Sequence, residues 1–216
     1  LDPAKPISGL SYRYEMLLVR RNGVFAAVRD HTAIVLRSAG TPAAAVVHLS
    51  HLLIDKAFRK TGLAGWMRAL PVQTAREALA VAGASPAAPI TLVAEMEPPH
   101  PAHPDRTIRL RSYENAGYLK IDPLAVPFLQ PDFRDPAAID LTGGARPIPM
   151  VLVIRRVGRE RETSLPAAEA RQIVRSLYRL YGLTFRPADM KPCRALLDAL
   201  PNEDRPINLL PPTSEG

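Results

Sequence analysis

Apolar and polar residues alternate along the first part of the chain as they do in paired strands. Residues 13–20 and 24–29 form two such stretches around Asn22-Gly23, and Asn-Gly supplies the positive φ angles that a tight hairpin turn needs. An apolar stretch at 33–37 follows. The run at 44–54 is then β-branched and apolar on both faces, which is typical of a buried central strand. The pattern predicts a hairpin followed by strands inside a sheet.

Helix-forming residues come directly after the strand at 44–54. They continue through 63–70 and 73–82, and Pro71 is expected to end or kink the first helix because proline lacks a backbone N–H. The remaining elements of the middle region are predicted in chain order as a strand at 90–97, a short helix at 106–116 closed by Gly117, and strands near 124–129 and 149–156.

Two helices are predicted near the C-terminus. One covers about 166–181, with Ser164 placed to cap its N-terminus, and the other covers roughly 187–199. The chain is therefore expected to be α/β (α+β), with a mixed, mostly antiparallel sheet, flanking helices and a C-terminal two-helix extension. The predicted division is a domain at 1–160 and a helical extension at 161–216 packed on it or on a partner.

Charge and cysteine content narrow the range of partners and compartments. The 216 residues carry a formal net charge of +7, which favours anionic partners such as nucleic acid, an acidic membrane surface or a phosphorylated cofactor. No run of 18 or more residues is apolar, so no membrane association is expected. The single cysteine, Cys193, excludes an intramolecular disulfide and favours a cytoplasmic location.

A basic, glycine-containing turn stands between the strand at 44–54 and the helix at 63–70. Its residues are Arg59, Lys60, Thr61, Gly62, Leu63 and Ala64. Backbone N–H groups at the start of a helix bind phosphate oxygens, and glycine lets a phosphate approach the main chain closely. An ordinary turn with solvated charges is the alternative.

This turn resembles the signature of the GNAT acyl-CoA N-acyltransferases. In that signature Arg or Gln is followed by two variable residues, Gly, one variable residue, and Gly or Ala; Arg59, Gly62 and Ala64 fill these places. A second segment, Ser112-Tyr113-Glu114-Asn115-Ala116-Gly117-Tyr118, is similar to the family's helix ending Leu-Tyr-Glu-Lys-Leu-Gly-Phe. The resemblance spans about residues 13–155.

The resemblance implies a sheet whose central strands splay apart to admit acetyl-CoA or another acyl-CoA. Pantetheine would pair with backbone groups near Leu52 and Ile54, while the amides of residues 60–64 hold the pyrophosphate. It also implies direct attack of an amine on the thioester, with Tyr113 protonating the departing thiolate. Only about 12 residues precede the first hairpin, where the family has a strand and two helices that wall the acceptor site. The acceptor is therefore not specified, and the tail helices are a candidate replacement for that wall.

Several groups compete for the role of general base. His48 shares a strand face with Ser50 and aligns with a position where relatives often place a base. Glu95 and Glu97, on the neighbouring strand, are its rivals, and a chain of water molecules is a further alternative.

Other polar clusters have structural interpretations. Residues 29–32 are predicted to form a capped turn, although Asp30 would also suit a cationic amine. His100 and His103 lie in a proline-rich loop without an evident third ligand, so no metal site is expected. Cys193 falls on the apolar face of a tail helix, which disfavours an acyl-cysteine route.

Two other functions fit the sequence less well. A CoA-binding domain without catalysis would keep Gly62 and Ala64. A nucleic-acid binder would use the basic run at 155–161, but the interleaved Glu160 and the scarcity of aromatic residues nearby disfavour it. The expected partners are therefore an acyl-CoA and an amine-bearing acceptor, and a homodimer is left open.

Overall fold

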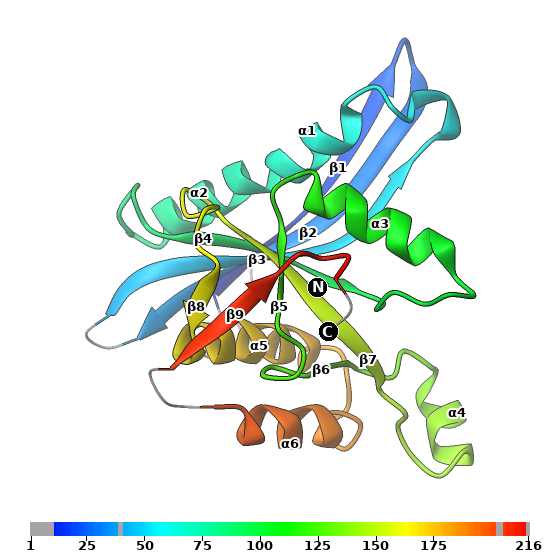
Figure 1. Cartoon of the computed structure of the whole chain (residues 1–216), viewed down its shortest axis with the longest axis vertical. Coiled ribbons are helices and arrows are strands. Elements are labelled where there is room, and N and C mark those ends of the chain that lie inside the picture. Colours follow the sequence, from blue (N-terminus) through cyan, green and yellow to red (C-terminus); the bar gives the residue numbers. More distant parts are fainter. Residues whose placement is uncertain (1–10, 39–40, 202–204, 215–216) are drawn as a thin grey trace. The chain divides into compact units, whose positions relative to one another are not determined.

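The computed structural model describes residues 11–38, 41–201 and 205–214 (Figure 1). By their contacts the residues divide into two units. The first comprises residues 1–94 and 155–158, and the second comprises residues 95–154 and 159–216. The units therefore meet between residues 94 and 95, between 154 and 155, and between 158 and 159.

The first unit is built on a sheet in the order β1-β2-β3-β4. Neighbouring strands are antiparallel except for β3 and β4, which are parallel. The bounds are β1 (Ser11–Arg21), β2 (Val24–Ser38), β3 (Thr41–Ile54) and β4 (Ile90–Met96), whose last two residues belong to the second unit.

The Asn22-Gly23 turn joins β1 to β2 as predicted, with φ angles of 53° and 81°. The predicted break at residues 29–32 is wrong, because β2 runs through them without interruption. The polar residues there suggested a turn, yet Arg29, His31 and Thr32 are buried within the strand. The segment forms sheet because its polar side chains are buried in the folded chain, where His31 contacts Thr74. A local sequence pattern does not reveal such burial.

A short 3-10 helix, η1 (Lys56–Phe58), and two helices follow β3. These helices are α1 (Leu63–Ala69) and α2 (Pro71–Val81). Leu70 between them keeps right-handed helical angles, and Pro71 takes the first position of α2, where its missing N–H costs no hydrogen bond. Helix α1 ends at Ala69, so the prediction that Pro71 ends or kinks the first helix is confirmed. Helix α2 packs on β1, β2 and β3 (Figure 1).

The second unit has a sheet in the order β7-β5-β9-β8, with β6 paired to β7, and all of these pairs are antiparallel. Helix α5 packs on β8 and β9, and α6 packs on α5 and β6 (Figure 1). The bounds are α3 (Pro104–Glu114), β5 (Leu119–Ile121), β6 (Phe128–Gln130), α4 (Pro136–Leu141), β7 (Ile148–Arg156), β8 (Ser164–Pro166), α5 (Ala167–Tyr181), α6 (Lys191–Ala199) and β9 (Pro206–Leu210).

The predicted fold class is confirmed: the chain is mixed α and β, its strand pairs are mostly antiparallel, and α5 and α6 lie near its end. One detail of the tail was predicted wrongly. Ser164 does not cap a helix but pairs with Asn208 in β8, while α5 (Ala167–Tyr181) agrees with the helix predicted at about 166–181. The segment after α6 forms β9, which pairs with both β5 and β8.

A buried polar chain links the sheet of the first unit to α2. The Thr74 hydroxyl donates to Glu15 Oε2 at 2.7 Å, and its oxygen lies 2.8 Å from His31 Nε2. A hydroxyl has a single proton, so His31 Nε2–H must donate to Thr74. Burial lowers the pKa of His31 from 6.5 to about 4, against the attraction of the Glu15 carboxylate. His31 is therefore neutral in the folded protein at neutral pH.

His31 makes the stability of the fold dependent on pH. Because its pKa is lower in the folded than in the unfolded chain, its stabilising contribution is complete above pH 6.5 and is lost as the pH falls toward 4. The free energy of unfolding should drop by about 3 kcal/mol across this window. Urea titrations of His31→Gln should show this loss abolished, whereas His51→Gln, at a histidine whose side chain is 89% exposed, should retain it. An unchanged slope in His31→Gln would contradict the assignment.

Candidate functional site

Strand β3 extends well beyond its parallel ladder with β4. The pairs run from Ala45↔Ile90 to His48↔Val93, and β3 then continues to Ile54 with β2 on its other side. This gives β3 a length of backbone past the end of the ladder.

A β-bulge lies where this extension begins. Arg29 pairs with Leu52 and His31 with Leu49, so β3 advances three residues while β2 advances two. Asp30 stands opposite the extra residue, and its carboxylate accepts the His51 N–H at 2.9 Å and contacts His51 Nδ1 at 3.0 Å. Asp30, considered above for binding an amine, therefore holds the bulge.

The predicted phosphate-binding turn has an unusual backbone. Lys60 and Gly62 both have left-handed φ angles, 62° and 84°, which is uncommon for a lysine. Gly62 is the N-cap of α1, and its carbonyl accepts the first helical bond, from Gly65 N–H at 2.9 Å. The amides ahead of Gly65 belong to the group that a helix start leaves without intrahelical partners.

Side chains in the turn fix its shape. The Arg59 guanidinium donates to the carbonyl of Ile54, 3.3 Å away, and the Thr61 hydroxyl donates to the carbonyl of Phe58 at 2.7 Å. Arg59, Lys60 and Thr61 are exposed. The turn therefore offers cationic side chains and helix-start amides to solvent, an arrangement that suits an anionic ligand.

His48 occupies the last rung of the β3–β4 ladder. Its side chain is buried, and its Nδ1 lies 3.4 Å from the Ser50 hydroxyl, in agreement with the expectation that His48 and Ser50 share a face. Ser50 itself is exposed.

Glu95 lines a hollow of about 160 Å³ in the second unit. The lining combines charged, amide and apolar side chains, namely Glu95, Met96, Glu97, Arg109, Gln130, Ile148 and Met150. Two neutral groups donate to Glu95: the Tyr181 hydroxyl to Oε1 at 2.7 Å and the Gln130 amide to Oε2 at 2.9 Å. The carboxylate is thus held from both oxygens.

Tyr181 is a residue that sequence reasoning did not connect with the site. Nothing in the neighbouring sequence indicates that its hydroxyl reaches a residue 86 positions away. Burial and the neighbouring Glu95 carboxylate raise the pKa of Tyr181, so it remains a hydrogen-bond donor. Phe133 and Phe185 meet its ring edge-on, with centroids 5.8 and 5.7 Å away.

Tyr113, the predicted general acid, lies in the last turn of α3. It is 8% exposed, and its ring packs edge-on against Tyr118 at 4.9 Å between centroids. Gly117 has a φ of 77° and Tyr118 N–H bonds back to the Tyr113 carbonyl, which confirms the predicted glycine cap. The Glu114 carboxylate accepts both the amide and the hydroxyl of Thr213, and this anchors the end of the helix.

Among the described residues, groups of three or more histidine, cysteine, aspartate or glutamate side chains able to hold a metal ion are absent. Within the same residues, every helix is too short or too polar to cross a membrane.

Comparison with known proteins gives little support for any assignment. No protein-family model and no curated protein sequence matches the chain. Among solved structures, it is similar to the crystal structure of nourseothricin acetyltransferase, with 12% identity and a TM-score of 0.29 over 68% of this chain and 98% of that one. Two backbones with so low a score do not superpose over most of their length, so that enzyme's activity is not carried over to this chain.

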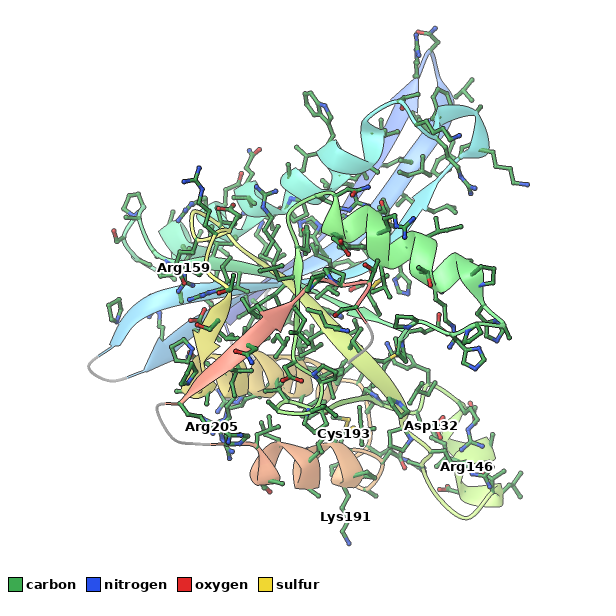
Figure 2. All side chains as sticks on the ribbon, in the orientation of Figure 1. Asp132, Arg146, Arg159, Lys191, Cys193 and Arg205 are labelled. Atoms are coloured by element: carbon green, nitrogen blue, oxygen red, sulfur yellow. The ribbon has the colours of Figure 1, made fainter. Side chains whose placement is uncertain are left out.

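Cys193 lies in a closed environment. It is fully buried on α6, and its thiol points to the carbonyl of Leu129 at 3.6 Å. Lys191, two residues earlier on the same helix, extends into solvent (Figure 2). Burial raises the pKa of the Cys193 thiol to about 11, so little thiolate exists at neutral pH.

Cys193 should therefore be inert toward thiol reagents in the native protein. At pH 8, DTNB should modify it only as fast as the chain unfolds, and modification should become rapid and stoichiometric in denaturing urea. A Lys191→Cys variant provides the exposed control and should react within seconds. Rapid modification of native wild-type protein would contradict the buried, protonated state.

Proposed function

We propose that this chain is an N-acyltransferase that moves an acetyl or other acyl group from acyl-CoA to an amine. One observation carries the proposal. Strand β3 runs past its ladder with β4 and ends in a basic turn whose Lys60 and Gly62 adopt left-handed angles at the start of a helix. An extended strand edge followed by a phosphate-binding turn suits a ligand with a pantetheine arm and a diphosphate.

Acyl-CoA would bind as a substrate along this strand and turn. Backbone groups near Leu52 and Ile54 would pair with the amides of the pantetheine arm. The N–H groups of residues 60–64 would receive the diphosphate oxygens, with Arg59 and Lys60 contributing positive charge.

The chemistry is an exchange of one acyl bond. The amine nitrogen attacks the thioester carbonyl, a carbon–nitrogen bond forms, and the carbon–sulfur bond breaks. The proton leaving the ammonium passes to a base, and Tyr113 supplies a proton to the departing thiolate. Glu95 is preferred as the base over His48, because Glu95 lines an open hollow whereas His48 is 7% exposed.

Substitution of Gly62 tests the turn as the diphosphate site. Asp accepts left-handed angles better than most residues, and at position 62 its negative charge would repel the diphosphate. Gly62→Asp should weaken acetyl-CoA binding at least tenfold by calorimetry.

Gly158→Asp is the matched control for Gly62→Asp. Gly158 has a φ of 81°, and neither glycine has an atom within 4 Å of an added Cβ, so both variants bear similar strain. Wild-type affinity is expected for Gly158→Asp. Absence of binding to the wild-type protein at millimolar acetyl-CoA would refute the proposal.

Tyr113→Phe tests the acid. Removing the hydroxyl should lower kcat, measured by thiol release with an amine panel, about 100-fold. The affinity for acetyl-CoA, measured by calorimetry, should stay unchanged. Tyr118→Phe, which keeps the ring contact with Tyr113, should stay within twofold of wild type. Full activity of Tyr113→Phe would remove Tyr113 from the mechanism. Tight acetyl-CoA binding without turnover of any amine would instead indicate a CoA-binding protein without catalysis.

A further inference from the structure

Strand β1 is an edge strand of the sheet in the first unit. It pairs with β2 along one edge, and among the described residues no strand pairs with its other edge. Successive residues of a strand direct their backbone N–H and C=O groups to opposite edges. Over the 11 residues of β1, about half of these groups are therefore available to another strand, and an edge of this length is a template for pairing with a second chain.

The two faces of β1 differ in character. Glu15 points to the face that α2 covers, where its carboxylate accepts the hydroxyl of Thr74 at 2.7 Å. Because side chains alternate along a strand, Tyr14, Met16 and Leu18 lie on the opposite face. They are 45%, 63% and 53% exposed. A row of three apolar side chains therefore stands in solvent beside the unpaired edge.

A second copy of β1 is complementary to this edge. A two-fold axis perpendicular to the sheet pairs the strand with its copy in an antiparallel ladder and keeps each face on its own side. With the axis at Met16, Ser11 stands opposite Arg21 of the second copy, so all 11 residues of β1 enter the ladder. Tyr14 then stands opposite Leu18 of the second copy, and Met16 stands opposite its own equivalent.

Charge distinguishes this register from its neighbours. An axis at Glu15 sets two glutamates directly opposite each other, and an axis at Leu17 sets Arg13 opposite Arg21. Like charges in such positions destabilise a strand pair. Axes further along the strand shorten the ladder. With the axis at Met16 no two charged residues are directly opposed, so length and charge favour the same register.

We propose that this chain forms a homodimer in which two β1 strands pair antiparallel about Met16 and join the sheets of the two copies. Backbone hydrogen bonds form along the edge, and the cross-strand pairs of Tyr14 with Leu18 and of Met16 with Met16 remove apolar surface from water. Both copies of α2 then lie on one face of the joined sheet. The dimer goes beyond the proposed acyl transfer and does not depend on it.

Sedimentation velocity across the micromolar range tests the interface. The wild-type protein should form dimers. Met16→Lys should raise the dissociation constant by about tenfold or more, because two ammonium groups would meet on the two-fold axis.

Leu53→Lys is the matched control for Met16→Lys. Val28 stands opposite both Leu18 and Leu53, so Leu53 lies on the same face as Met16 but two strands away from the edge. It is 56% exposed, similar to Met16. This variant should dimerise as the wild type does.

Cysteine cross-linking tests the register. In the proposed ladder the two Cα atoms of residue 16 lie about 4.5–5.5 Å apart, a separation that a disulfide spans. Met16→Cys should therefore form a covalent dimer on oxidation. Leu17→Cys should not, because each copy of residue 17 would stand opposite Glu15. The native Cys193 is buried and should give no cross-linked background.

Thermal unfolding shows whether each variant is folded, and Met16→Cys remains as a test if Met16→Lys is unstable. A monomeric wild type overturns the inference, including one whose exposed apolar row binds lipid vesicles or an unrelated protein instead. Unchanged dimerisation of Met16→Lys also overturns it. Dissociation of Leu53→Lys would place the contact on the face of the sheet and overturn edge pairing, and cross-linking of Leu17→Cys in preference to Met16→Cys would overturn the pairing about Met16.

Discussion

The extra residue that β3 carries opposite Asp30 is the feature on which the candidate CoA site depends. A bulge leaves a backbone amide outside the regular ladder. Here Asp30 accepts the His51 N–H at 2.9 Å, which fixes the bulge in place. The bulge also increases the local twist of the strand, just beyond the last β3–β4 pair at His48. Between His48 and the basic turn, one edge of β3 is therefore outside the ladder with β4.

Local sequence signals predicted several turns and helix ends correctly. Asn22-Gly23, Pro71 and Gly117 each act through their own backbone angles or missing N–H, and such effects can be read from neighbouring residues. The position of Gly62 at the start of α1 follows from the same kind of signal. Neighbouring residues are therefore enough to assign these turns and helix ends.

The errors occurred where a distant partner decides the structure. Residues 29–32 suggested a turn because they are polar, yet His31 is held inside β2 by Thr74, which lies 43 positions away. Ser164 has the character of a helix cap, but β9 offers it a strand partner at Asn208. The bonds from Tyr181 and Gln130 to Glu95 likewise join segments 86 and 35 positions apart. No periodicity or spacing carries that information.

The turn at residues 59–64 and the hollow that Glu95 lines differ in chemical character. The turn presents helix-start amides with Arg59 and Lys60, which suits a diphosphate. The hollow combines the Glu95 carboxylate with apolar side chains. Each element is fixed by residues of its own unit: Gly62 and the Arg59–Ile54 bond shape the turn, while Tyr181 and Gln130 hold Glu95.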